Sequence, residues 1–194
     1  MRLKCCTADL FAGVPGSSGT VLCSTDQSRL CQECARVGKT CCQGHDIYVT
    51  RGDCLRIFNC LQDRTFYEYR SCCDPAYAEQ SEDPLWEKYV FRSDGRRRVL
   101  KHKDNGDCML LTSTGCLLPI DARPLVCRLF PHLYSAGGIT DQWDGACPAA
   151  ATTAAIVMEN GIAGIAQCDA AKWHQLLYYE VLWEKIGDED WINL

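Results

Sequence analysis

The chain has 194 residues, 16 of them cysteine, and a formal net charge of −5. This length suits one domain and leaves little room for two. The acidic balance gives no electrostatic reason to bind nucleic acid or an anionic membrane, so neither is an expected partner. The cysteine content, about 8% (16 of 194), approaches that of a disulfide scaffold, so the redox compartment decides how the thiols are interpreted.

The sequence predicts a cytoplasmic protein. Residues 1–10 hold two basic side chains without the apolar run of about 7–15 residues that a signal peptide places behind them. The longest apolar run, 149–158, is much shorter than the roughly 20 residues that span a bilayer. Disulfides are rare in a reducing cytosol, where clustered cysteines more often bind metal or carry redox chemistry. We therefore expect metal ligands here, rather than a disulfide scaffold or scattered free thiols.

The first predicted element is a helix over 26–37. Thr25 is a suitable N-cap and Gly38 a suitable stop. Cys31 and Cys34 would share one face of this helix. An irregular knuckle is the alternative, and it brings the same two sulfurs together.

Cys41 and Cys42 follow Cys34 after six residues, which gives four thiols within twelve residues. A two-residue gap lets one turn present two sulfurs to the same ion, as in zinc and iron–sulfur sites. Adjacent side chains do not easily point at one ion. The pair therefore serves two sites or is strained to serve one.

A second helix is predicted to begin at Thr50, because Asp53 follows three residues later as in a capping box. Its apolar side would consist of Leu55, Ile57, Phe58 and Leu61. Cys54 and Cys60 lie on this helix, and a role as small buried hydrophobes and a ligand role both remain open. Cys72 and Cys73 form another adjacent pair, on a predicted loop.

Residues 89–118 predict an antiparallel β-meander, because short β-prone segments alternate with good hairpin turns. The basic residues 96–98, with Lys101 and Lys103, would lie on its middle strand. A solvated edge or face is the expected role for them, and a surface for an acidic partner is the alternative. A single hairpin turn would bring Cys108 and Cys116 to one end of the paired strands.

Three prolines then punctuate a segment that we expect to be irregular, and it contains Cys127 and Arg128. Arg128 is expected to donate a hydrogen bond to sulfur or to form a surface salt bridge. Farther along, Cys147 precedes Pro148, a favourable first residue for a helix ending at 160–161. The helix dipole would favour a Cys147 thiolate.

The last predicted element, a helix over 169–186, is apolar on more than one face. We expect a core helix, and a self-association surface is the alternative, which would make the protein a homo-oligomer.

The cysteine spacing resembles that of the YkgJ-type cysteine-cluster family, described as a zinc- or iron-chelating domain. The resemblance covers about residues 31–148. It rests on Cys31-x2-Cys34-x6-Cys41-Cys42, Cys108-x7-Cys116, Arg123-Pro124-x2-Cys127-Arg128 and Cys147-Pro148. It implies eight metal ligands: Cys31, Cys34, Cys41, Cys42, Cys108, Cys116, Cys127 and Cys147. A similar motif in flagellin lysine methylases implies an iron–sulfur cluster.

We therefore expect a single α+β domain over 1–194, small, cysteine-rich and stabilised by metal, with helices flanking the meander and much irregular loop. Its metal-binding core would cover about 31–148 and its C-terminal helices about 148–187.

Thiolate ligands favour Zn²⁺ or iron–sulfur clusters over Mg²⁺ or Ca²⁺. The paired cysteines and the excess of thiols favour iron–sulfur, most simply 4Fe-4S, for electron transfer, redox sensing or accessory metallocluster chemistry with an unidentified redox or protein partner. A zinc-stapled interaction module with two four-cysteine sites is the alternative. No complete catalytic motif is present, so a non-enzymatic role is favoured. His132, near Cys127, and His45 are the best histidine candidates for a ligand or proton carrier, and an ordinary loop histidine is the alternative for each.

Overall fold

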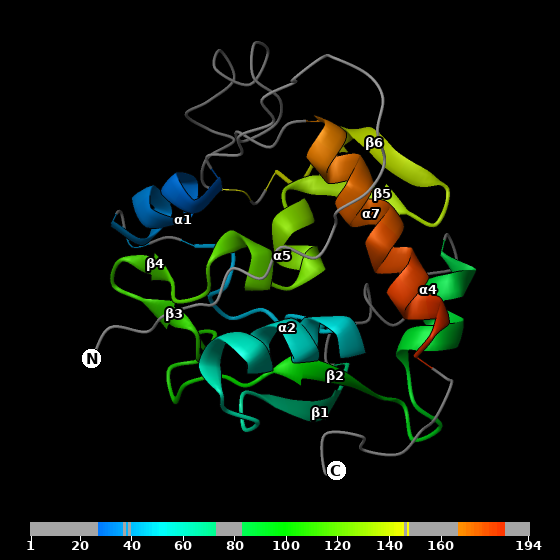
Figure 1. Ribbon diagram of the computed structural model, residues 1–194, viewed down its shortest axis with the longest axis horizontal. Helices are drawn as coiled ribbons and strands as arrows, with labels where there is room; N and C mark the ends of the chain where they lie inside the picture. Colours follow the sequence, from blue (N-terminus) through cyan, green and yellow to red (C-terminus); the bar gives the residue numbers. More distant parts are fainter. Residues whose placement is uncertain are drawn as a thin grey trace, which may run out of the picture.

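The computed structural model describes residues 27–36, 38, 40–72, 83–145, 147 and 167–184. These residues form five α-helices, one 3₁₀ helix and three two-stranded antiparallel sheets (Figure 1). The predicted mixed α+β class is therefore confirmed. Cys5, Cys6, Cys23 and Cys73, and the helix expected after Pro148, lie outside the described residues.

Both helices predicted in the first third of the chain are present. Helix α1 (Gln27–Arg36) is followed by Gly38 at φ +74°, a left-handed conformation that ends helices at low cost in glycine. Helix α2 (Arg51–Leu61) begins with the expected capping box. The Asp53 amide donates to the Thr50 hydroxyl and the Thr50 amide donates to the Asp53 carboxylate.

The antiparallel strands do not form one meander. Strand β2 (Arg96–Leu100) pairs with β1 (Tyr67–Ser71), and Tyr67 lies opposite Leu100. A helix lies between these two strands in the chain. Strands β3 (Leu111–Thr112) and β4 (Gly115–Cys116) make a separate hairpin. The hairpin turns were therefore predicted better than the pairing, because a turn is local whereas a strand partner is chosen by packing.

The basic segment is not a solvated face. Arg96 is exposed, but Arg97 and Arg98 are only 4% and 7% exposed. Arg98 donates to the main-chain oxygen of Val49 and forms an ion pair with Glu184, with Nη1–Oε2 at 3.0 Å. Burying a guanidinium is tolerated here because it is paired and hydrogen-bonded.

The segment expected to be irregular contains two short helices. The 3₁₀ helix η1 (Ile120–Ala122) is followed by α5 (Leu125–Leu129), which carries Cys127 and Arg128. Pro119 and Pro124 precede these helices with extended backbone, so the prolines start helical turns here instead of preventing them.

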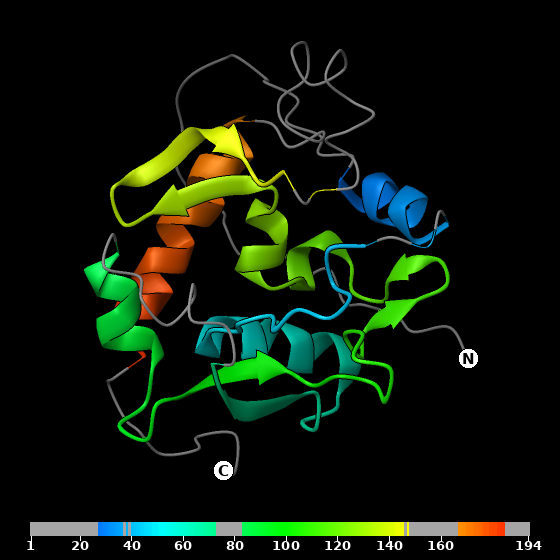
Figure 2. The same ribbon diagram turned by 180° about the vertical axis from the view of Figure 1, so that it is seen from behind.

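The remaining elements lie on one side of α5 (Figure 1). Helix α4 (Pro84–Val90) and helix α7 (Gln167–Leu182) pack together, and the hairpin of β5 (His132–Ser135) and β6 (Gly138–Trp143) lies against α7 (Figure 2). Tyr89, expected in the meander, is in α4. Of the predicted C-terminal helical region, the structure describes α7.

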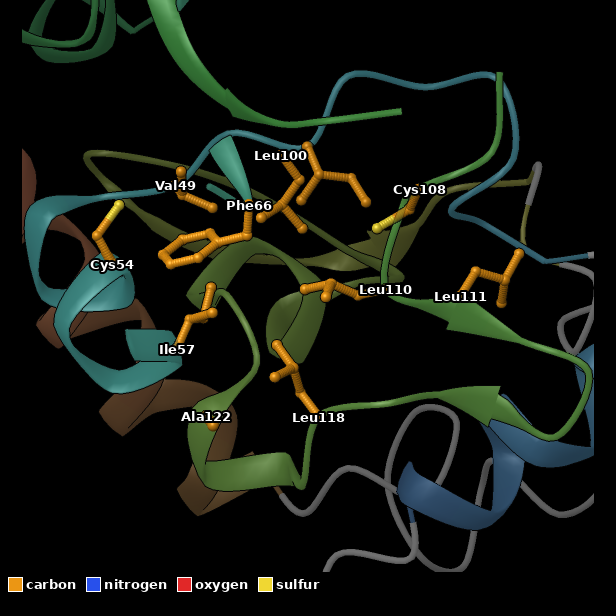
Figure 3. Close-up of a cluster of buried hydrophobic side chains, with 11 residues drawn as sticks. Val49, Cys54, Ile57, Phe66, Leu100, Cys108, Leu110, Leu111, Leu118 and Ala122 are labelled. Atoms are coloured by element: carbon orange, nitrogen blue, oxygen red, sulfur yellow. The ribbon is translucent and has the colours of Figure 1, made fainter. Parts of the chain in front are cut away.

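Two clusters of buried side chains form the core. One lies between α2, the β1–β2 sheet and the segment from Cys108 to Ala122, and it includes Ile57, Phe66 and Leu118 (Figure 3). The other joins α4, α5 and α7 through Trp86, Leu125 and Leu177. Cys54 is fully buried in the first cluster, which agrees with its expected alternative role as a small hydrophobe.

Helix α7 is buried along one side, as expected of a core helix. Leu177 and Val181 are fully buried, whereas Tyr179 and Trp183, beyond the helix end, are exposed and their rings are 6.0 Å apart. Self-association through that exposed side stays a prediction. Within the described part of the chain, no helix has the length and apolar character needed to cross a membrane.

Replacing Thr50 by alanine tests the cap of α2. We expect Thr50→Ala to lower the free energy of unfolding by about 1–2 kcal/mol, because it removes both the acceptor for the Asp53 amide and the hydroxyl that donates to Glu180. Urea denaturation measures the change. Thr114→Ala, in the exposed β3–β4 turn, is the control and should stay within about 0.5 kcal/mol of the parent protein. Equal effects of the two substitutions would contradict the role of the cap.

Candidate metal centre

Seven of the eight predicted ligands come from segments that meet at one place in the fold. Helix α1 supplies two, the loop after it two, the segment before β3 one, β4 one and α5 one. Cys108 is buried, and the other six are half-buried. The seven are Cys31, Cys34, Cys41, Cys42, Cys108, Cys116 and Cys127.

Main-chain hydrogen bonds join the Cys42 segment to the Cys108 segment. The Cys108 amide donates to the Cys42 carbonyl at 2.9 Å, and the Gly44 amide donates to the Gly106 carbonyl at 3.2 Å. Cys108 is thus held by the loop after α1. The predicted hairpin does not place it opposite Cys116, because β3–β4 pairs Leu111 with Cys116.

A glycine allows α1 to approach β4. Gly115 has φ +106°, and a Cβ atom added there would lie 3.1 Å from the Cys31 carbonyl oxygen. Any larger residue would have to push the two main chains apart, so Gly115 brings Cys31 and Cys116 near one another.

A buried carboxylate places α5. The Leu125 amide, at the start of this helix, donates to Asp53 Oδ1 at 3.0 Å. Asp53 therefore caps α5 from α2 as well as capping its own helix, and a carboxylate is the favoured group at a helix N-terminus. This contact fixes the position of Cys127, two residues farther along.

The thiols are close enough to change each other's ionisation. Burial is the main cause that raises the pKa of Cys31, Cys116 and Cys127, and it raises the pKa of Cys108 to about 12. A negative charge on Cys42 raises the pKa of each of these four thiols further. Cys42 is therefore the common neighbour of the group.

The adjacent thiols of Cys41 and Cys42 shift each other's pKa in opposite directions. The contact with the Cys41 thiol lowers the pKa of Cys42 to about 6, and the positive charge of Arg123 lowers it in the same direction. The same contact with Cys42, together with burial, raises the pKa of Cys41. Cys42 is thus the thiol best prepared to bind as a thiolate.

Arg123 is a cation among the thiols. Its Nη1 donates to Cys31 Sγ at 3.1 Å and its Nε donates to the Leu118 carbonyl at 3.0 Å. Burial raises the pKa of Cys116, and the charge of Arg123 opposes that rise. The sequence reasoning assigned a sulfur contact to Arg128, as one of two alternatives, and overlooked Arg123. Arg128 is buried rather than on the surface, and it donates to the main-chain oxygens of Arg123 and Asp121.

Cys147, the eighth predicted ligand, follows β6 in the chain. It is buried, and its amide donates to the Asp144 carbonyl at 3.1 Å. A ligand role for Cys147 stays a prediction. Of the cysteines outside the predicted set, Cys72 is half-buried at the end of β1.

The two candidate histidines lie in different environments. His132 is on β5 rather than in a loop, is 7% exposed, and has no hydrogen-bond partner for either ring nitrogen among the described residues. Burial lowers its pKa, which favours the neutral ring. His45 is exposed. A ligand role for either stays a prediction.

Over the part of the chain that the structure describes, no three His, Cys, Asp or Glu side chains are placed as a group that could hold a metal ion. The fold gathers the predicted thiols into one region, and the binding of metal there stays a prediction. No family model, curated protein or solved structure matches this chain. The resemblance to the YkgJ-type family therefore also stays a prediction.

Replacing Arg123 tests its effect on Cys42. In the reduced, metal-free protein we expect Cys42 to be the fastest thiol to react with iodoacetamide at pH 6–7, since its pKa is about 6. Arg123→Gln removes the positive charge, so the midpoint of the pH–rate profile should rise. Peptide mass spectrometry with fragment ions separates Cys42 from Cys41.

Arg123→Lys is the matched variant, because it keeps the charge and loses the guanidinium fork. Its midpoint should lie closer to that of the parent protein. A profile for Arg123→Gln that overlies the parent profile would contradict the electrostatic role of Arg123.

Proposed function

We propose that the protein binds one or more iron–sulfur clusters, most simply 4Fe-4S, and serves in electron transfer, redox sensing or accessory metallocluster chemistry. The observation that carries this proposal is the gathering of seven cysteines from separate segments around Cys42 and Arg123. Clustered thiols are the ligands that iron–sulfur clusters use in proteins.

The chemistry of the side chains present suits an iron–sulfur cluster, because thiolates are its usual ligands. The seven thiols that would hold it are Cys31, Cys34, Cys41, Cys42, Cys108, Cys116 and Cys127. When bound, an iron–sulfur cluster supplies a centre that gains and loses one electron. Burial raises the pKa of most of these thiols, so binding a metal centre has to release protons into solution.

Two features favour a cluster over a single zinc ion. A structural zinc site uses four ligands, whereas seven thiols occupy this region. In addition, Arg123 already donates a hydrogen bond to a sulfur, and such bonds are one of the means by which proteins set cluster potentials. Arg123 would stabilise the more negative, reduced state.

Zinc remains the alternative because of how the thiols pack. Cys42, Cys116 and Cys127 lie against the hydrophobic cluster that contains Leu110 and Leu118. A metal ion at this position would tie α1, β4 and α5 to the core, and its binding energy would then contribute directly to folding. The protein would in that case be an interaction module without a redox centre.

Metal and sulfide analysis decides between the two. We expect the protein purified without oxygen to contain about four or eight iron atoms, and as many acid-labile sulfides, per chain. Its visible spectrum should show a broad band that bleaches on reduction. About two zinc ions per chain and no sulfide would overturn the iron–sulfur proposal and support the structural zinc site.

Cys42→Ser tests the assignment of the site. Because Cys42 neighbours most of the other thiols, its replacement should remove at least half of the bound iron and sulfide. Cys72→Ser is the matched control, since Cys72 is also half-buried but lies at the end of β1, outside the group. Equal metal content in the parent and Cys42→Ser proteins would place the metal elsewhere.

A further inference from the structure

Helix α1 differs from the other helices in what holds it in place. It has ten residues, and an isolated helix shorter than about 12–15 residues is only marginally stable in water. Figure 1 and Figure 2 place it at the edge of the molecule, against β4. None of its described side chains belongs to either buried cluster of the core. Within the described residues, apolar packing in the core therefore does not account for the position of α1.

The contacts that position α1 are made by one of the proposed metal ligands. Cys31 Sγ accepts a hydrogen bond from Arg123 at 3.1 Å. The main chain of Cys31 lies against Gly115 of β4, where an added Cβ would be 3.1 Å from the Cys31 carbonyl oxygen. Cys31 and Cys34 are half-buried, whereas Gln32 is exposed. The two thiols thus lie on the inner side of α1, as their spacing of three residues allows.

The thiols on the other side of this contact are held by the core itself. Cys108 is a buried member of the first hydrophobic cluster, and Cys42, Cys116 and Cys127 pack against that cluster. The main-chain hydrogen bond from Cys108 to Cys42 ties two of these segments together. Protein packing therefore positions these four residues, which we call the core thiols.

A glycine separates α1 from the core thiols. Gly38 lies between α1 and Cys42 in the chain, with φ +74° and open space where its Cβ would be. Glycine changes its backbone angles at low cost, because no Cβ restricts them. Hinges are formed by a few loop or element-terminal residues that absorb such changes. Gly38 is therefore suited to act as a hinge between α1 and the core.

We propose that α1 is a metal-dependent lid over the proposed metal centre. In the metal-free protein, α1 opens about Gly38 while the core thiols stay in place. In the metal-bound protein, Cys31 and Cys34 add their thiolates to those of the core, and α1 is held against β4. The structure shows this closed position. Metal enters and leaves when α1 is open, so closure of α1 controls how long the metal stays bound. This lid rests on the proposed function, because it closes by binding metal.

Hydrogen–deuterium exchange with peptide mass spectrometry tests the lid in the full-length protein. Reduced, metal-free protein is compared, without oxygen, with protein given Zn²⁺ and with protein given Fe²⁺ and sulfide, and the bound metal is measured in each sample. Bound metal should slow the exchange of the amides of 31–36 by about tenfold or more, because these amides exchange when α1 opens. The amides of α2, which packs in the core, should change by less than about twofold.

Cys34→Ser connects this protection to a thiol of α1. The variant should still bind Zn²⁺ through the core thiols, but its residues 31–36 should keep exchanging rapidly. Transfer of the bound Zn²⁺ to a colorimetric chelator should be about tenfold faster than in the parent protein, because the lid no longer closes. Gln32→Ser is the matched control, since Gln32 is exposed on the same helix, and it should behave like the parent.

The outcomes separate the lid from the proposed function. Metal-loaded protein whose residues 31–36 exchange as fast as in the metal-free protein would overturn the lid and leave the metal centre standing. Protection of α1 in the metal-free protein equal to that of α2 would do the same. Loss of all metal from Cys34→Ser would make α1 an essential part of the centre and no lid. Absence of bound metal from every preparation would overturn the proposed function and the lid together.

Discussion

The arrangement of the helices depends on one buried carboxylate. Asp53 is fully buried and accepts hydrogen bonds from the amides of Thr50 and Leu125, which start α2 and α5. Arg56 donates to Asp53 at 2.6 Å and also to Glu180 of α7 at 2.7 Å. One charged network therefore holds three helices together.

Burial of that network is costly unless every member is paired. Burial raises the pKa of Asp53, and the positive charge of Arg56 opposes that rise. The close packing needed here also explains Gly52, where an added Cβ would lie 2.2 Å from the Glu180 carboxylate. Removing a single partner would leave an uncompensated buried charge, so the network acts as a unit.

The proposed metal site lies at the margin of this network. The capped α5 carries Cys127 to the other thiols. The site does not contain Asp53, yet it takes its position from the helices that Asp53 joins.

The sequence by itself determined the features that depend on neighbouring residues. Thr50 and Asp53 predicted the start of α2, Gly38 predicted the end of α1, and cysteine spacing identified the thiols that the fold brings together. Only the tertiary structure decided the rest, because it depends on contacts between distant segments. The pairing of β2 with β1, the burial of Arg97 and Arg98 and the sulfur contact of Arg123 all belong to this group. The physical reason is that a cap or a turn is set within four residues, whereas a strand partner or a buried charge is selected by the packing of the whole chain.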